Sequence, residues 1–523
     1  MAPHDVRPDP RPDDGIEEAE ILLTASEAFP AFERMFLGAR ERIVLGFRIF
    51  DPRTRLHSPE ARAVGEDWFD LVAHTLRRGV ALTMVLSDFD AVVRPDYHQR
   101  ATRCLRLLIA AGEVSGRMDL LSVHTSLHPA RTGLLPSVIL WPRARGLLLG
   151  TVSTINKLPQ IARGRRLREL PALMPLFAVK DDRTVSLRQM AMPRLVPVTH
   201  HQKIAVADGE VLYVGGLDLN DRRWDTPDHD RPGSETWHDA QLLVRGPVAL
   251  SAEAHLRSFE AVTHGAEPPP APGLLRTVSR KRTRGAVFLS PMPVLTEIAA
   301  MHEAQADAAE RLIYLESQFF RDTKFARHLA RAARRNPKLG MVLILPAAPE
   351  DVAFDDNSGS DARYGEYLQA RAVRIVRRAF GDRLFIGSPA QPRSVPENGR
   401  ATLYGAPLVY LHAKVSIFDG ARAIVSSANL NGRSFRWDTE AGVMLTDPEK
   451  AGRLAFRCAA HWLAGPVEPA FTDPASAVQA WRTRARANAA RRPEDREGFI
   501  LPYTSAPARR FGHSIPGIPE EMV

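Results

Sequence analysis

Two stretches of this chain share one pattern of residues, and those residue types could perform nucleophilic and acid–base chemistry. Residues 201–208 and 412–419 both read His-x-Lys-x4-Asp, and each is followed six residues later by a turn of small residues, at 215–218 and 426–429. A single copy would be compatible with an ordinary strand that contains a histidine. Two copies with the same internal spacing indicate a duplicated site. We predict a site made of His201, Lys203, His412, Lys414 and Asn429.

A site that combines both copies would hold two imidazoles and two ammonium groups. Imidazole titrates near neutral pH, so one histidine can attack while the other donates a proton. A phosphodiester fits best: one histidine would form a covalent phosphohistidine, and the other would protonate the leaving alkoxide and then activate water or another alcohol. The lysines would stabilise charge on the non-bridging oxygens. We predict further substrate contacts from Gly216, Asp218, Gln318 and Ser427.

The use of lysine supports a specific role for the two ammonium groups. The chain has 62 arginines and only eight lysines, yet both motifs carry lysine. A compact ammonium charge differs from the planar fork of a guanidinium group. The pattern therefore indicates that Lys203 and Lys414 supply point charges, for which arginine would not substitute.

Two acidic residues occur where they could orient the histidines. A catalytic histidine needs a partner that fixes its tautomer. Asp239 and Glu440 each stand at the start of the strand that follows a motif turn. We predict that they lie behind His201 and His412, respectively; the alternative is that they are exposed acids at strand starts.

The elements that must position these residues are two buried strands. Apolar residues alternate along both motifs, and residues two apart on a strand share a face, so each histidine is expected beside its lysine. Asp208 and Asp419 follow their histidines by seven residues, which is roughly 20 Å along an extended strand. We therefore predict structural roles for both aspartates, in turns or ion pairs.

The motif strands belong to an order of elements that occurs twice. Predicted strands at 42–50 and 80–86 precede the first motif, and strands at 311–320 and 341–346 precede the second, with helical patterns between them. Such alternation predicts an α/β fold with two tandem domains. The predicted boundaries are a disordered segment at 1–19, a first domain at 20–265 with an insertion at about 126–196, a linker at 266–284, a second domain at 285–465 and a C-terminal tail at 466–523.

Composition limits the kinds of partner and the cellular compartment that we expect for this protein. The net charge of +9 favours anionic partners such as phosphate esters, lipid headgroups or nucleic acid. Two distant cysteines exclude a disulfide framework and a cysteine-type zinc site. The N-terminus lacks a secretory signal pattern, and no apolar run reaches the roughly 18 residues of a spanning helix. We expect a soluble cytoplasmic protein that can touch membranes peripherally. The insertion, with apolar pieces and a basic cluster at 163–168, is either a membrane-facing or substrate-lining excursion or a packed surface segment.

A metal centre is the main chemical alternative for the motifs. A lysine beside each histidine opposes a divalent cation, and neither a His-Glu-x-x-His motif nor a cysteine pair occurs. His124 and His128 form a His-x3-His pair, but no acid lies between them and Pro129 follows. We interpret them as loop or surface histidines, and we expect the chemistry to need no metal and no cofactor.

The residues around both motifs resemble the phospholipase D superfamily, whose signature is His-x-Lys-x4-Asp-x6-Gly-[Gly/Ser]-x-[Asn/Asp]. Residues 200–225, 237–239, 314–320 and 411–433 are most similar to its eukaryotic-type branch, apart from a serine at 426 where glycine is usual. The resemblance covers about residues 20–465. It implies two α/β sandwich domains related by a pseudo-twofold axis, one active site at their interface, and no metal. It also implies that His201 is the nucleophile and His412 the general acid, which the nearly symmetric motifs alone leave open.

The expected activity is hydrolysis of the headgroup phosphodiester of glycerophospholipids to phosphatidic acid, with transfer to alcohols as a side activity. Three alternatives stay open: a phosphatidyltransferase of the cardiolipin synthase kind, a nuclease with the same chemistry, and an inactive protein that binds lipid or nucleic acid. Intact histidines and lysines in both motifs oppose the last. The expected partner is a phospholipid membrane surface, ahead of nucleic acid, with no obligate protein partner.

Overall fold

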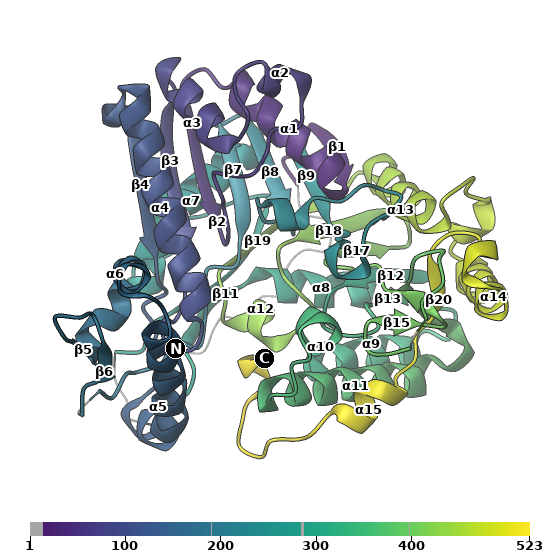
Figure 1. Ribbon diagram of the computed structural model, residues 1–523. Coiled ribbons are helices and arrows are strands. Elements are labelled where there is room, and N and C mark those ends of the chain that lie inside the picture. Colours follow the sequence, from purple (N-terminus) through teal and green to yellow (C-terminus); the bar gives the residue numbers. More distant parts are fainter. Residues whose placement is uncertain (1–13, 190, 284–286, 397) are drawn as a thin grey trace.

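Two mixed β-sheets, one in each half of the chain, form the framework of the protein (Figure 1). The computed structural model describes residues 14–189, 191–283, 287–396 and 398–523. The chain therefore has two tandem α/β domains, as the alternation of strands and helices predicts.

The first sheet has the strand order β1-β9-β8-β7-β2-β3-β4. Strands β2, β3 and β4 are parallel, and β7 runs antiparallel to β2. The strands are β1 (Glu18–Leu23), β2 (Arg42–Phe47), β3 (Ala81–Ser87), β4 (Leu121–Ser126), β7 (Lys203–Ala207), β8 (Val211–Gly215) and β9 (Ala240–Arg245). Helices α1 (Thr24–Gly38), α3 (Trp68–Arg77) and α4 (Pro95–Ser115) cover one face, and α7 (Val248–His264) packs on the other.

The second sheet has the order β11-β10-β19-β18-β17-β12-β13-β14-β20. Its strands are β10 (Leu274–Arg280), β11 (Met292–Thr296), β12 (Leu312–Ser317), β13 (Gly340–Ile344), β14 (Leu384–Pro389), β17 (Lys414–Phe418), β18 (Arg422–Ser426), β19 (Glu440–Leu445) and β20 (Ile500–Pro502). Helices α8 (Glu297–Ala308), α9 (Thr323–Arg335) and α11 (Ser360–Phe380) cover the outer face, and α13 (Pro448–Leu463) and α14 (Ala477–Ala490) pack on the inner one. Shorter elements are α2 (Pro59–Arg62), α10 (Glu350–Phe354), α12 (Gly432–Arg436), α15 (Ala506–Phe511), β15 (Thr402–Leu403) and β16 (Ala406–Pro407).

The strand registers show how closely the two halves repeat. Phe47 pairs with Lys203 in the first sheet, and Ser317 pairs with Lys414 in the second. The next residues along the chain, Arg48 and Gln318, therefore occupy equivalent positions. One apolar core contains residues of both sheets and of α7 and α13, so burial of this shared surface holds the halves together.

The predicted linker at 266–284 is wrong in part, because it contains strand β10. This strand pairs with β19 as β1 pairs with β9, so it begins the second repeat. The apolar stretch that forms β10 lies between a proline run at 268–270 and basic residues at 280–282, and both flanks are typical of a linker. Its backbone groups find partners in the sheet, which a linker would not provide.

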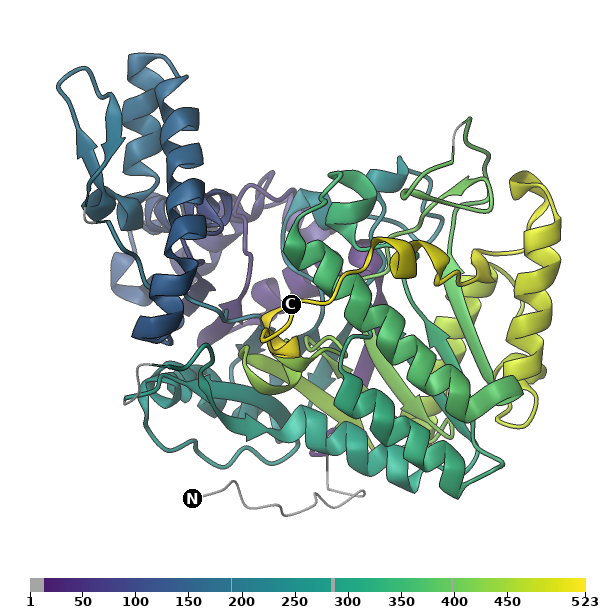
Figure 2. The same ribbon diagram turned by 90° about the horizontal axis from the view of Figure 1, so that it is seen from below.

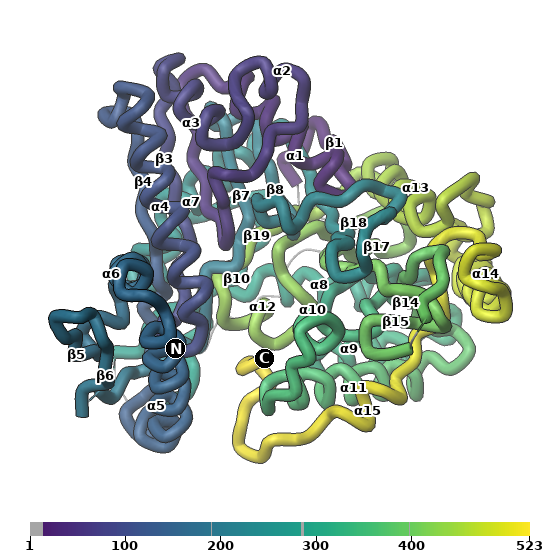
Figure 3. The backbone as a smooth tube through the Cα atoms, viewed as in Figure 1, coloured from purple at the N-terminus to yellow at the C-terminus, as the bar shows by residue number. Residues whose placement is uncertain are grey.

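The two terminal segments also differ from the prediction. Strand β1 starts inside the segment predicted to be disordered, and Asp14 accepts hydrogen bonds from the amide and hydroxyl of Thr446; residues 1–13 lie outside the described part. The predicted tail belongs to the second domain. Strand β20 covers the edge of β14, α14 buries Trp481, and the chain ends beside α12 (Figure 3).

The insertion forms a lobe that projects from the first domain (Figures 1 and 2). It contains α5 (Leu134–Asn156), α6 (Gln160–Arg168) and the strand pair β5 (Phe177–Val179) and β6 (Val185–Leu187). A separate small core that includes Leu148, Ile155 and Phe177 holds it together. Of the helices that the structure describes, none combines the length and apolar character needed to cross a bilayer.

Candidate active site

Both motif histidines lie just before the strands that carry their lysines, where the two halves of the chain meet. The residues leading into each motif pair with the segment that precedes the acid of the other half. The amide of His201 donates to the carbonyl of Thr439 (2.8 Å), and the amide of His412 donates to the carbonyl of His238 (2.7 Å). Short parallel bridges accompany these bonds.

This pairing crosses the acids between the halves. His201 Nδ1 lies 3.0 Å from Glu440 Oε2, and His412 Nδ1 lies 2.6 Å from Asp239 Oδ2. Both acids lie behind histidines, but the predicted partners are exchanged. The reason is topological: β8 separates β9 from β7 in the same sheet, so Asp239 starts two strands, roughly 10 Å, away from its own motif.

The two lysines are buried beside the histidines. Lys203 Nζ donates to the carbonyl of His201 and lies 3.6 Å from Asp218 Oδ1. Lys414 Nζ donates to the carbonyl of His412 and lies 2.8 Å from its Nδ1. Burial, which disfavours the charged form, lowers the pKa of Lys203 to about 8 and that of Lys414 to about 7. Both ammonium groups therefore titrate close to neutral pH.

Burial shifts the pKa values of the histidines and of their acids in opposite directions. Loss of solvent, followed by the nearby lysine charges, lowers the pKa of His201 and His412 well below the usual value. Burial raises the pKa of Asp239, and it raises the pKa of Glu440 to about 8. Because its pKa is about 8, Glu440 holds a proton at neutral pH, which it can share with His201.

Both histidines line one cavity of about 430 Å³, whereas Lys203 and Lys414 are buried behind them and are absent from its described lining. Two predicted site residues, Gln318 and Asn429, share it, and Asn429 Oδ1 has no hydrogen-bond partner among the described residues. The lining also contains five arginines, which can contact an anion, and five acidic residues: Arg48, Arg94, Arg223, Arg321 and Arg433, and Glu350, Asp351, Asp355, Asp361 and Asp438.

The structure departs from symmetry at one pair of equivalent positions. Arg48 forms an ion pair with Asp218 (3.1 Å), whereas the equivalent Gln318 donates to the hydroxyl of Tyr410 (2.8 Å). Asp218 itself stands where the second half has Asn429. At these equivalent positions the first half therefore has an ion pair, and the second half has neutral amides. Sequence reasoning missed Arg48, which an alignment of the strands at 42–50 and 311–320 in this register would have found.

Three predicted substrate contacts are corrected. Asp218, Gly216 and Ser427 are buried and lie behind the site, and they are absent from the described lining of the cavity. Asp218 neutralises Lys203 and Arg48. The Ser427 hydroxyl donates to Glu440, and a Cβ at position 216 would lie 2.2 Å from Asp239 Oδ1. Small residues at both turns leave room for the two acids, so these residues position the acids.

Asp208 and Asp419 lie at the far ends of the motif strands. The Asp208 carboxylate accepts hydrogen bonds from three successive backbone amides, at residues 40–42. Asp419 does the same at residues 310–312. Each aspartate ties the end of its motif hairpin to the start of the neighbouring strand, β2 or β12.

The His-x3-His pair does not form a site. His124 is half-exposed and bonds to Glu260 (2.9 Å). His128 lies in the loop after β4, as one of the two predicted possibilities has it, but it is buried, and its Nε2 contacts the carbonyl of Ser279 (3.2 Å). The two rings thus have separate partners.

Activity is expected to fall as pH rises through about 7 to 8. Lys414 and Lys203 carry their charges only below their pKa values of about 7 and about 8, so alkaline pH removes the cations that would stabilise phosphoryl oxygens. On the acid side, activity should persist below pH 6.5, the ordinary histidine value, because the pKa of His201 is lowered. A kcat/KM profile on a soluble short-chain phospholipid measures both limbs.

A guanidinium group stays protonated across this range. Lys414→Arg and Lys203→Arg should therefore lower the rate but shift the alkaline limb upward. An alkaline limb that is unchanged in both variants would mean that other groups cause it.

Comparison with known proteins adds an independent line of evidence. Residues 303–462 match the family model described as "Cardiolipin synthase, PLD-like domain". Phospholipase D1 of Schizosaccharomyces pombe is 21% identical over 364 residues, covering 49% of this chain and 26% of that protein. Cardiolipin synthase A of Pseudomonas aeruginosa is 26% identical over 263 residues, covering 49% of this chain and 44% of that protein.

A third curated relative, phospholipase D gamma 3 of Arabidopsis thaliana, is 21% identical over 383 residues, covering 46% of this chain and 43% of that protein. The chain thus spans less than half of the length of these relatives. The crystal structure of Haemophilus influenzae phosphatidylserine synthase aligns with 90% of this chain and 94% of that chain, at 12% identity and a TM-score of 0.46. The family model that matches residues 303–462, the curated relatives and the two His-x-Lys motifs around one cavity together support membership of the phospholipase D superfamily.

Proposed function

We propose that the protein is a phospholipase D-type phosphodiesterase, which cleaves the headgroup phosphodiester of glycerophospholipids and releases phosphatidic acid. The observation that supports this most is the convergence of His201 and His412 on one cavity. Each histidine has a carboxyl group at its inner nitrogen and a lysine beside it. The motif residues favour the eukaryotic-type branch of the superfamily.

In the proposed first step, His201 Nε2 attacks phosphorus, because Glu440 occupies its Nδ1. The bond from phosphorus to the headgroup oxygen breaks, and the proton held by His412 and Asp239 passes to the leaving alkoxide. In the second step, water gives a proton to His412 and attacks phosphorus. The phosphorus–nitrogen bond breaks, and phosphatidic acid leaves. An alcohol in place of water would give a phosphatidylalcohol.

A second candidate is phosphatidyl transfer, in which the acceptor is the glycerol hydroxyl of another lipid. The match to the family model described as "Cardiolipin synthase, PLD-like domain" and to cardiolipin synthase A favours it. Both candidates share the phosphohistidine and differ only in the nucleophile of the second step.

Purified protein given phosphatidylcholine and a primary alcohol, without added metal, is expected to release choline and form the phosphatidylalcohol. Parallel reactions would contain phosphatidylglycerol alone or single-stranded DNA. Formation of cardiolipin with release of glycerol would favour the second candidate, and cleavage of DNA alone would refute both. His201→Asn should abolish product, whereas His124→Asn, at a half-exposed histidine outside the cavity, should not.

We further propose that the lobe formed by the insertion binds an anionic membrane surface. Residues 133–195 contain eleven lysines and arginines against three acids, a net charge of +8 in a chain whose total is +9. The lobe also contains ten of the eighteen large apolar side chains that are exposed among the described residues. Exposed apolar groups beside basic residues are typical of peripheral membrane attachment.

A contact between the lobe and the rim of the cavity supports this proposal. The Arg143 guanidinium on α5 donates to the hydroxyl of Ser360 (2.7 Å), next to Asp361 in the cavity lining. The exposed side chains of Leu135, Val138 and Ile139 precede Arg143 by one to two helical turns. A bilayer that contacts this end of α5 would lie near the cavity mouth.

Replacement of Arg163, Arg165 and Arg166 by glutamine should weaken binding to vesicles that contain phosphatidylglycerol by roughly 100-fold, since each basic residue near an anionic surface contributes about 1 kcal/mol. Ile139→Ser should also weaken it, while Leu250→Ser, at an equally exposed position on α7, serves as the control. Vesicle co-sedimentation measures binding. Activity on a soluble short-chain lipid should stay unchanged, and vesicle binding that is equal in all variants would exclude the lobe as the contact surface.

A further inference from the structure

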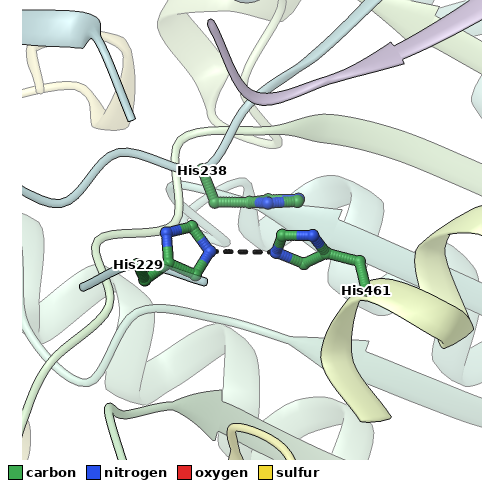
Figure 4. A group of neighbouring side chains, drawn as sticks. All are labelled: His229, His238 and His461. Carbon is green, nitrogen blue, oxygen red and sulfur yellow. Dashed lines mark hydrogen bonds between the residues drawn. The ribbon is translucent and has the colours of Figure 1, made fainter. Parts of the chain in front are cut away.

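Three histidines meet between the two halves of the chain, outside the cavity described above (Figure 4). His229 lies in the loop that follows the first motif, His238 lies just before β9, and His461 lies on α13. All three are buried, and one ring nitrogen of each lies within 4.8 Å of the others. Nε2 of His229 and Nε2 of His461 are 2.9 Å apart. The cluster therefore joins the first domain to the second.

Two polar groups in this cluster lack partners. Neither ring nitrogen of His238 has a hydrogen bond within the described residues, and neither does Oε2 of Glu316, which lies 3.5 Å from His238 Nε2. The other oxygen, Oε1, accepts hydrogen bonds from Trp462 Nε1 (2.9 Å) and from the hydroxyl of Tyr314. Buried polar groups are almost always paired, and leaving one unpaired costs about 1–3 kcal/mol. The unpaired nitrogens of His238 therefore lie beside the His229–His461 pair, with the unpaired oxygen of Glu316 next to them.

The charges around the cluster are unbalanced. The carboxyl groups of Asp225 and Glu316 are both fully buried. In the part of the chain that the structure describes, histidine is their only ion-pair partner, with no lysine or arginine within reach. Both carboxyl groups accept hydrogen bonds, but burying their negative charge is still costly without a full positive charge nearby. One divalent cation would balance two of them.

The orientation of His229 fits a metal ligand. Asp225 Oδ2 lies 2.6 Å from His229 Nδ1 and also accepts from the amide of Trp237 (2.6 Å). This fixes the proton on Nδ1 and directs the lone pair of Nε2 toward His461. A carboxylate behind a ligating histidine is the usual arrangement at protein metal sites.

We propose that His229, His238 and His461 bind one zinc ion that fastens the two domains to each other. Imidazole nitrogens suit zinc among the common divalent metals. Nitrogens of a tetrahedral site lie about 3.4 Å apart when the metal–nitrogen bonds are about 2.1 Å, and the observed separations, from 2.9 Å to at most 4.8 Å, bracket that value.

The role of this zinc ion is structural and goes beyond the proposed reaction. None of the three histidines is in the described lining of the cavity. His238 is joined directly to Asp239, whose carboxyl group holds His412. Coordination of His238 would therefore fix the backbone from which Asp239 reaches across the domain interface.

The test is metal analysis of the full chain, produced with zinc in the medium and purified without chelator. About one zinc ion per chain is expected. His461→Gln should lose it, whereas His302→Gln, at a fully buried histidine on α8 that bonds to Ser416, should retain it. A chelator should lower the Tm of the wild-type protein by several degrees, and zinc should restore it, because a ligand that binds only the folded state stabilises that state. The Tm of His461→Gln should respond to neither.

A second readout covers the case in which His461→Gln does not fold. Cobalt added to the metal-free wild-type protein should give the visible absorption of a tetrahedral centre, and one equivalent of zinc should remove it. Two results together would overturn the proposal: less than one zinc ion per wild-type chain after reconstitution, and a Tm that chelator does not change. The three histidines would then form a hydrogen-bonded cluster without metal. Loss of zinc from His302→Gln as well would place the metal elsewhere. These readouts do not depend on phospholipid turnover, so they are independent of the proposed activity.

Discussion

His201→Asn is expected to abolish the covalent intermediate and to lower kcat/KM for phosphodiester cleavage by at least about 10⁴-fold, the scale seen when an enzyme loses its nucleophile. Asparagine retains a polar group of similar size near Glu440 but has no nitrogen that can attack phosphorus. Rapid quenching of a reaction with radiolabelled phospholipid, in denaturant at alkaline pH, would measure the phosphohistidine. Native protein should carry label, and His201→Asn should not.

His412→Asn should behave differently because it removes the proton donor and leaves the nucleophile in place. The phosphoenzyme should still form and should break down more slowly, with turnover lowered by about 10²- to 10⁴-fold. His124→Asn is the matched control for loss of an imidazole away from the cavity. A labelled adduct on His412 in the native protein would reverse the two roles, and a fully active protein without any adduct would exclude the covalent route.

Replacement of the acids should reveal the crossed arrangement of the site. Glu440 contacts His201, so Glu440→Gln should slow formation of the phosphoenzyme, by up to about 10⁴-fold when an amide can no longer fix the tautomer. Asp239 contacts His412, so Asp239→Asn should slow breakdown and make labelled protein accumulate. Single-turnover kinetics separates the two steps.

Acids that served the histidine of their own half would give the opposite pattern, with Asp239→Asn slowing formation and Glu440→Gln slowing breakdown. Glu260→Gln is the control for loss of a carboxylate that pairs with a histidine outside the site. Glu260 is partly exposed, and its described ion-pair partner is His124. Equal effects of both acid variants on both steps would contradict the assignment of each acid to one histidine.

The sequence predicts the repeated α/β plan because strands and helices leave a periodic signal in neighbouring residues. It also predicts which residues gather at the site, since two equal motifs imply equal surroundings. The local sequence does not predict strand β10, because the proline and arginine residues that flank it are typical of a linker. The predicted boundaries at 266–284 and 466–523 are wrong because pairing with a distant strand, such as β19 or β14, leaves no pattern among neighbouring residues of the sequence.

The contacts that cross between the halves are harder to predict than the elements. The residues of the His201–Glu440 pair are 239 positions apart, and those of the His229–His461 pair are 232 apart. No spacing rule joins residues at such separations, because their approach depends on how two folded domains dock. The equivalence of Arg48 and Gln318 is different: it follows from strand register and could be obtained from a careful internal alignment.

The exchange of acids between the halves has a consequence for the cell that makes this protein. A growing chain that has passed residue 201 already carries the predicted nucleophile, but its carboxyl partner is 239 residues further on. A partly synthesised chain therefore has His201 without its orienting carboxyl group, and it lacks the residues of the second half that line the cavity. Under the proposed function, a chain still being synthesised near the producer's own lipids would be unable to cleave them, because the site is complete only after Glu440 and its strand β19 have been added.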